Sequence, residues 1–306
     1  MVREYLERYK GKLLEDIFKG IEIENEFGRC YLIENRYDVK LANYSPERVH
    51  RRFITDLKLI REIRRSTERM LKSQGYRTID KLLNHPHYCL YARDFLEVYY
   101  RRNTYELQRI VERRFSKSHP LSLFLSGFHK KTDFLFFDIE TMGLSTFNPV
   151  ILIGVARFEN GALSVKQFLA RDIDEEKSIL FEFMKMITDK SAFVTFNGKK
   201  FDVPFIAERL RYHGLCYDLR RANFDLLLFS RRVWRGKLPN CRLLTIEKHV
   251  LGINREEDVD SYLVPYFYRE YLRHKNPGPL VPLIEHNRQD VLSLSLLFSK
   301  LIELIK

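Results

Sequence analysis

The stretch FLFFDIETMG, residues 134–143, ends a run of large apolar residues in two acids, Asp138 and Glu140, that are one residue apart. Successive side chains of a strand point to opposite faces, so these acids would share one face with Phe134 and Phe136. Both carboxylates are therefore expected to project together from the end of a buried strand. Open α/β sheets bind their ligands at the carboxyl ends of such strands.

A second candidate segment is FNGKKFDVPFI, residues 196–206. A short apolar strand is expected to end at Asn197, and a helix is expected to begin near Asp202 with Pro204 in its first turn. Taken alone, Asp202 has the ordinary explanation of a helix cap.

Two further acids complete the set. His286 and Asp290 in HNRQDVLSLSLLF are four residues apart, hence on one face of the last expected helix. Alone, such a pair is typical of a helix surface. Asp225 in NFDLLLF again stands at the edge of an apolar run.

Several carboxylates that converge on one spot repel one another unless cations bind between them. Hard oxygen ligands without paired thiols point to Mg²⁺ or Mn²⁺. Two such ions are a general device for in-line displacement at phosphorus. A nearby base would then take the proton of the attacking water, and His286 is the candidate for that role.

The elements that position these residues read as strands at 134–140, 149–160 and 162–170, then a helix, a short strand at 192–197 and further helices. Asn160 and Gly161 form a strong hairpin signal between the second and third strands. A hairpin that leads into alternating helix and strand predicts a mixed sheet flanked by helices.

The first part of the chain has a different character. Residues 20–39 suggest a β-hairpin around Gly28, and helical periodicity dominates from about Pro46. Pro120, Gly127 and a loss of periodicity suggest a boundary, which predicts a domain at 1–130 and another at 131–306.

Charge is also uneven. Residues 1–130 carry 27 Lys and Arg against 18 Asp and Glu, whereas residues 131–306 carry 26 against 23. The segment 56–84 resembles a degenerate helix-hairpin-helix unit whose hairpin lacks glycine, so Arg61, Arg64 and Arg65 are expected to contact phosphate by their side chains. The alternative interpretation is a solvated, packing-only helical region.

At 306 residues and 45% hydrophobic content, the chain can form one large or two ordinary globular domains. The first residues lack the apolar core of a signal peptide, and no segment has 18 uninterrupted apolar residues, which predicts a cytoplasmic protein with no membrane partner. The four widely spaced cysteines are expected to be free thiols.

Together FDIET, FNGKKFDVPFI and HNRQD resemble the three exonuclease motifs of the ribonuclease-H-like DEDD superfamily, in particular the YprB-like predicted exonucleases. These are related to the 3′–5′ exonuclease domain of family B DNA polymerases. The resemblance covers residues 133–306. It implies an α/β fold: a ribonuclease-H-like mixed five-stranded sheet flanked by helices, preceded by a smaller, mainly helical domain with a β-hairpin.

The resemblance also implies roles for individual residues. The implied ligands of two Mg²⁺ or Mn²⁺ ions are Asp138, Glu140, Asp202 and Asp290. Thr141, Asn197 and Phe201 would contact substrate, and Asp225 would be accessory. The polymerase-like branch has Tyr where this chain has His286, so His286 acts either as the general base or by orienting water.

These observations predict a metal-dependent 3′–5′ exonuclease acting on single-stranded DNA or RNA. Three alternatives remain open at this stage. They are an endonuclease of the same fold, a catalytically inactive nucleic-acid-binding module, and a protein-interaction domain whose carboxylates are caps and surface pairs.

Overall fold

The computed structural model describes residues 1–255 and 259–305. One mixed sheet forms its centre, with strand order β1-β2-β5-β4-β3-β6-β7. The strands are β1 (Gly20–Asn25), β2 (Gly28–Tyr37), β3 (Phe134–Thr141), β4 (Val150–Glu159), β5 (Ala162–Leu169), β6 (Ala192–Thr195) and β7 (Asn223–Asp225). Only the β3–β6 and β6–β7 pairs are parallel.

The helices fall into two groups along the chain. Those before β3 are α1 (Val2–Arg8), α2 (Leu14–Ile17), α3 (Pro46–Ile54), α4 (Arg65–Ser73), α5 (Cys89–Tyr100), α6 (Thr104–Arg114) and α7 (Pro120–Phe124). Those after it are α8 (Glu176–Lys185), α9 (Asp202–Tyr212), α10 (Leu226–Trp234), α11 (Leu243–Ile246), α12 (Val264–His274) and α13 (Leu280–Leu304). A π-helical turn, Glu247–Leu251, follows α11 directly.

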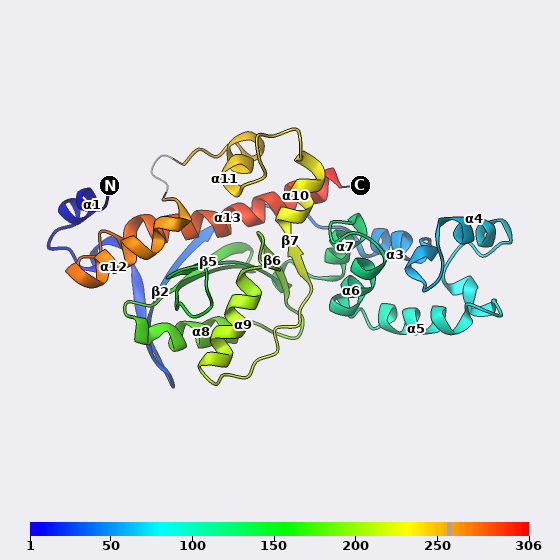
Figure 1. The fold of residues 1–306 in the computed structure, drawn as a ribbon, viewed down its shortest axis with the longest axis horizontal. Coiled ribbons are helices and arrows are strands. Elements are labelled where there is room, and N and C mark those ends of the chain that lie inside the picture. The colour runs from blue at the N-terminus through cyan, green and yellow to red at the C-terminus, as the bar shows by residue number, and fades with distance from the viewer. Residues whose placement is uncertain (256–258, 306) are drawn as a thin grey trace.

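The sheet lies between two helical layers, with α13 running along one face and α8 and α9 covering the other (Figure 1). The alternation expected for β3 is confirmed. Phe134 packs against Phe298 of α13, with ring centroids 5.0 Å apart, whereas Phe137 packs against Phe183 of α8 at 5.1 Å. Asp138 and Glu140 therefore belong to the face that carries α13.

The expected hairpin at β1 and β2 is present, and it enlarges the sheet. Tyr31 to Tyr37 of β2 pair antiparallel with Leu169 to Leu163 of β5. The five strands β5, β4, β3, β6 and β7 form the expected mixed core, and the hairpin extends it to seven. The sheet has two strands more than expected because β2 pairs with the open edge of β5. Local sequence patterns do not reveal such long-range pairing.

The helices α3 to α7 form a lobe beside the β7 edge (Figure 1). Gln108 of α6 closes that edge: its side-chain amide donates to the Asn223 carbonyl oxygen and accepts from the Asn223 N–H, both at 3.0 Å. One hydrophobic cluster runs from Phe53 in this lobe to Phe298 under the sheet. The lobe and the sheet thus share a core across the expected boundary near residue 130, and the division into two domains stays a prediction.

The segment resembling a helix-hairpin-helix unit contains one α-helix, α4, between two 3₁₀ turns at Leu57–Leu59 and Asp80–Asn84. The first of the two expected helices is thus a single turn. All four cysteines are free, as expected. Among the helices that the structure describes, none combines the length and apolarity needed to cross a membrane.

Candidate active site

A cavity of about 640 Å³ opens beside the carboxyl ends of β3 and β6. Its lining includes Asp138 from β3, Asn197 from the loop after β6, and both His286 and Asp290 from α13. Residues as far apart in the chain as Asp138 and Asp290 therefore meet in one cleft. The sequence analysis expected Asp138 and Asn197 at strand ends and His286 and Asp290 on one face of a helix. The parallel pairing of β3 and β6 brings the two strand ends together.

The carboxylates of this cleft influence one another strongly. Burial raises the pKa of Asp138 well above its usual range, and the nearby carboxylates of Asp290, Asp202 and Glu140 raise it further. Asp138 thus stands within electrostatic reach of the three other predicted ligands. Such mutual repulsion, in a buried cleft, is the condition that a bound cation relieves.

Asn287, the residue after His286, holds Asp138 in place. Its side-chain N–H donates to the Asp138 carboxylate and to the Asp138 carbonyl oxygen, each at 3.2 Å. Its own amide oxygen accepts a hydrogen bond of 3.0 Å from the buried Gln167 of β5. Gly154 of β4 pairs with Asp138, and a Cβ atom there would collide with Asn287. Glycine is therefore required for α13 to approach the sheet at this point.

Asp202 is the first residue of α9, and its side chain is 3% exposed. Burial, together with the carboxylates of Asp225 and Asp290, raises the pKa of Asp202 to about 7, although hydrogen bonds from its own N–H and that of Ile139 act in the opposite direction. The N-cap position of α9 is occupied by Phe201, so the ordinary N-cap explanation does not account for Asp202.

Asp225 supports the loop that carries Asn197. Its buried carboxylate accepts the backbone N–H of Asn197 at 2.8 Å, of Lys199 at 3.3 Å and of Leu227 at 3.2 Å. Asn197 adopts a left-handed backbone with φ of 68°, and the bond from its N–H to Asp225 holds that turn. Asp225 therefore positions the loop after β6 and caps α10 at the same time.

A guanidinium group lies among the acids. The Arg255 side chain, 8% exposed, donates to the Asp290 carboxylate and forms two hydrogen bonds of 2.6 and 2.8 Å with Glu247. It also contacts Nδ1 of His286 at 3.3 Å. Because a guanidinium can only donate, a hydrogen bond here requires Nδ1 to accept, which assigns the proton of the neutral His286 ring to Nε2. That nitrogen is 3.7 Å from an Asp290 oxygen and 4.0 Å from a Glu140 oxygen.

Two other predicted site residues, Thr141 and Phe201, do not line this cavity. The Thr141 hydroxyl donates to the Gly143 carbonyl oxygen at 2.8 Å and so shapes the turn after β3. Phe201 packs against Phe205, with centroids 5.3 Å apart, and is not among the residues lining the cavity.

The three arginines of the helix-hairpin-helix-like segment are exposed and do not line the cavity. Arg61 pairs with Glu62 at 3.8 Å, and Arg64 and Arg65 begin α4. Figure 1 places α4 at the end of the helical lobe that is remote from β3. Contact between nucleic acid and Arg61, Arg64 and Arg65 stays a prediction for a site away from the cleft.

Sequence reasoning missed Asn287, Arg255 and Glu247. A glycine in the middle of the apolar strand VILIGVARFE and a Gln in the next strand were signals for Asn287, since both mark a close polar approach inside a sheet. No local pattern marks Arg255, which reaches Asp290 from a loop 35 residues away.

The donor set suits a hard divalent cation, because buried carboxylate oxygens are the ligands that Mg²⁺ and Mn²⁺ prefer. Over residues 1–255 and 259–305, however, no group of three or more potential ligands is gathered closely enough to hold an ion. Arg255 supplies the positive charge at Asp290 instead.

Comparisons with known proteins place the chain in a family. A family model described as the RNase H superfamily matches residues 135–302. The uncharacterised protein YprB of Bacillus subtilis (strain 168) is 34% identical over 223 residues, which are 69% of this chain and 52% of YprB. The chain thus spans about half the length of that curated relative. A family B DNA polymerase from Pyrobaculum calidifontis is similar over 55% of this chain and 24% of its own, with 19% identity and a TM-score of 0.42.

Proposed function

We propose that this chain, which belongs to the ribonuclease H superfamily, is a metal-dependent nuclease that degrades single-stranded DNA or RNA from the 3′ end. The observation that supports this proposal most is that the carboxylates of Asp290, Asp202 and Glu140 lie near enough to the half-buried Asp138 to raise its pKa. Four buried or half-buried acids would not lie near one another for packing alone, because each charge costs desolvation energy.

In the proposed reaction, Asp138, Glu140, Asp202 and Asp290 hold two Mg²⁺ or Mn²⁺ ions. Bound divalent cations supply the charge that activates a water molecule and stabilises the leaving oxygen at phosphorus. Asn287 orients the Asp138 carboxylate through its 3.2 Å hydrogen bond. Asn197, held by Asp225, faces the substrate from the loop after β6.

We assign His286 the role of orienting water. Its Nδ1 accepts from Arg255, so Nε2 carries a proton and points a donor toward the carboxylates. A general base would need a free lone pair on Nε2. Of the two roles that the sequence leaves open, this geometry favours the orienting one as long as Arg255 stays in place.

Linear and circular single-stranded DNA of the same sequence test the proposal. With Mn²⁺ or Mg²⁺ we expect loss of the linear strand and an intact circle, because an exonuclease needs an end. EDTA and the Asp138→Asn variant should abolish cleavage. A circle cut at the same rate as the linear strand would establish an endonuclease instead, and cleavage that persists in the variant would refute the assigned metal centre.

A further inference from the structure

The segment between Asp225 and Glu247 contains basic residues and no acidic ones. Residues 226–246 contain five basic residues, Arg231, Arg232, Arg235, Lys237 and Arg242, and no Asp or Glu. All five are exposed. The segment includes α10, the loop after it and α11, which flank the catalytic cleft.

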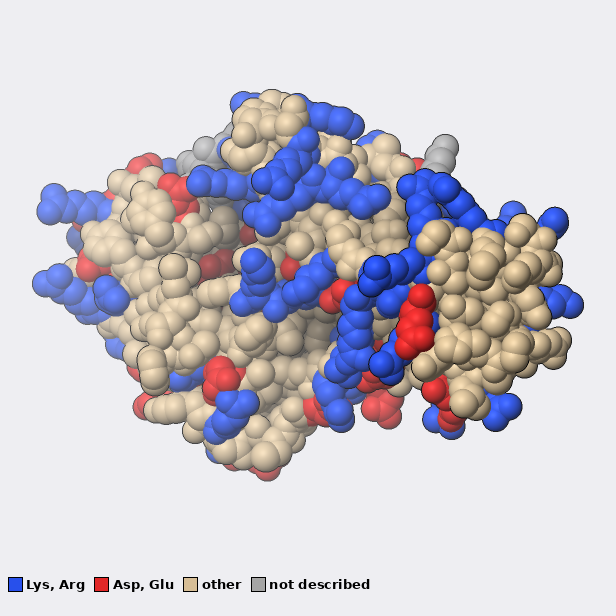
Figure 2. Space-filling model, turned by 45° about the vertical axis from the view of Figure 1, so that its right-hand side comes forward, with Lys and Arg blue, Asp and Glu red and all other residues tan. Residues whose placement is uncertain are grey.

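This basic segment adjoins the cleft through a second cavity. A hollow of about 410 Å³ is lined by residues that include Arg231, Arg235, Asn240 and Cys241. Arg231, Asn240 and Cys241 also line the cleft of Asp138, His286 and Asp290. The shared residues place the two hollows next to each other, and the pair is called the groove below. Arg242 lines the hollow that holds the acids. Figure 2 shows Lys and Arg side chains gathered around a hollow in the middle of this face, with acidic side chains visible inside it.

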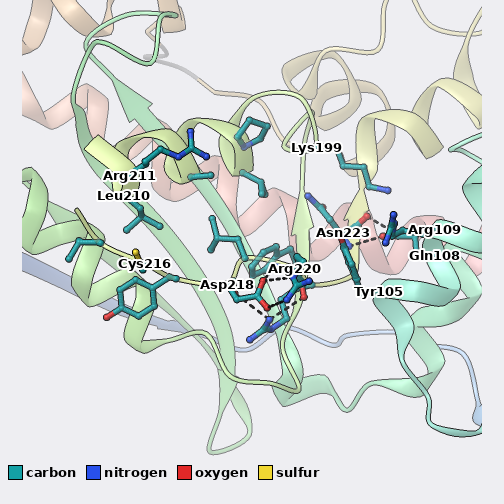
Figure 3. A pocket seen from close by; sticks show the side chains of 18 of the residues that line it. Tyr105, Gln108, Arg109, Lys199, Leu210, Arg211, Cys216, Asp218, Arg220 and Asn223 are labelled. Atoms are coloured by element: carbon teal, nitrogen blue, oxygen red, sulfur yellow. Dashed lines mark hydrogen bonds and ion pairs between the residues drawn. The ribbon is translucent and has the colours of Figure 1, made fainter. Parts of the chain in front are cut away.

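The ion pairing of the basic residues distinguishes the groove from another cavity. That cavity, about 990 Å³, lies between α6 and α9 and also has cationic side chains in its wall (Figure 3). All of its lining cations except Lys117 pair with carboxylates: Arg109 with Glu106 at 3.1 Å, Arg211 with Glu208 at 2.6 Å and Arg220 with Asp218 at 2.9 Å. Lys199 and Arg221 are paired as well.

The five cations of residues 226–246 differ in this respect. Within the part of the chain that the structure describes, none of them forms an ion pair with a carboxylate. A row of exposed, uncompensated cations that ends at an acidic catalytic cleft matches a polyanion whose chain enters that cleft.

The groove also offers a surface for bases. Tyr262, with 75% of its side chain exposed, lines the cleft beside Leu244 and Phe196. Cationic grooves with exposed aromatic rings are the general device for single strands, because unpaired bases stack on the rings while the phosphates contact the cations. A base inside a duplex has no free face for such stacking.

We propose that the groove formed by Arg231, Arg235 and Arg242 is the path of a single polynucleotide strand, with its phosphates on these arginines and a base stacked on Tyr262. The proposal rests on the proposed nuclease function, since it takes the acidic cleft as the end of the path. It assigns to residues 231–242, outside the three motifs, the task of holding the strand.

The test is fluorescence anisotropy with a 5′-labelled oligothymidine in EDTA, which permits binding without cleavage. The variant Arg231→Gln/Arg235→Gln/Arg242→Gln is compared with Arg109→Gln/Arg211→Gln/Arg220→Gln, which removes the same charge from the cavity between α6 and α9. We expect the groove variant to lose at least tenfold in affinity and the steepness of its salt dependence to fall by about 2, from three lost phosphate contacts on a single strand. The matched variant should stay within about twofold of wild type.

A second pair of variants tests the stacking surface. Tyr262→Ala should weaken binding of the single strand about tenfold, whereas Tyr212→Ala, equally exposed at 72% but outside the groove, should not. The proposed strand path would be refuted if the groove variant and the matched variant lost equal affinity for the oligothymidine. It would also be refuted if the groove variant kept wild-type affinity. If the wild type binds the strand through the groove but does not cleave it with any metal, the nuclease function is refuted and the strand path is still supported.

Discussion

At the scale of single residues, the raised pKa of Asp202 makes the stability of the folded protein depend on pH. Its pKa in the folded state, about 7, lies above the ordinary value of 3.8. The folded protein therefore binds its proton more tightly than the unfolded chain, and stability falls as pH rises from about 4 through 7. Without metal, the carboxylate at pH 8 destabilises the protein.

The first prediction follows from this fall in stability with rising pH. Asp202→Asn, which keeps an oxygen acceptor, should raise the melting temperature by several degrees at pH 8 in EDTA and leave it nearly unchanged at pH 4.5. Addition of Mn²⁺ should raise the melting temperature of the wild type more than that of the variant. Differential scanning calorimetry at the two pH values measures this. A variant that is less stable than wild type at pH 8 would contradict the assigned pKa.

A second residue-scale prediction concerns Arg255, whose guanidinium and a metal ion would compete for Asp290. The double variant Arg255→Gln/Glu247→Gln removes both charges of the buried pair, so Glu247 is not left uncompensated. We expect Mn²⁺ to bind about tenfold more tightly, because a charged hydrogen bond to Asp290 no longer has to break. Titration calorimetry gives the affinity, with Arg220→Gln as a control distant from the cleft. Unchanged or weaker binding would show that Arg255 does not compete with the ion.

At the scale of elements, the contact between α13 and the sheet determines where Asp138 points. Gly154→Ala places a Cβ atom against Asn287, and such overpacking typically costs about 1 to 3 kcal/mol. Unfolding in urea should show this loss, and Mn²⁺ affinity should fall because Asn287 no longer orients Asp138. Adding Asn287→Ala to Gly154→Ala should restore part of the stability. If the two changes destabilise additively, Gly154 and Asn287 are not in conflict.

The same elements show what the sequence could and could not predict. The apolar run in FLFFDIE predicted the strand. The two-residue period of a strand, which is a local property, then predicted its two faces and the shared side of Asp138 and Glu140. The four-residue spacing of His286 and Asp290 predicted their common helix face in the same way. The network of Asn287, Gln167 and Gly154 joins α13, β5 and β4, and such contacts depend on packing between elements that no local pattern encodes.

Arg255 and the helix-hairpin-helix-like segment illustrate two other limits. Arg255 reaches the acids from a loop, where neither periodicity nor capping marks a side chain as functional. Residues 56–84 have the rhythm of a two-helix unit, yet the first helix is only a 3₁₀ turn at Leu57–Leu59. Short segments gain their helicity from tertiary contacts rather than from propensity.

At the scale of the whole molecule, the helical lobe and the sheet share one hydrophobic cluster, and Gln108 joins them at β7. We therefore predict a single cooperative unfolding transition. Trp234, the only tryptophan, belongs to that cluster and reports on it by fluorescence, while far-ultraviolet circular dichroism follows all helices. The two thermal curves should coincide in EDTA. Two separate midpoints would show that the lobe unfolds independently and would support a division near residue 130.

The central claim is that the converging acids form a metal-dependent nuclease centre, and one time course tests it most directly. A 5′-labelled single-stranded oligomer is incubated with the wild type in Mn²⁺, in Mg²⁺ and in EDTA, beside Asp138→Asn. The claim predicts a ladder of progressively shorter labelled products that requires both the metal and Asp138. An intact substrate in all wild-type reactions, or the same ladder from Asp138→Asn, would contradict it.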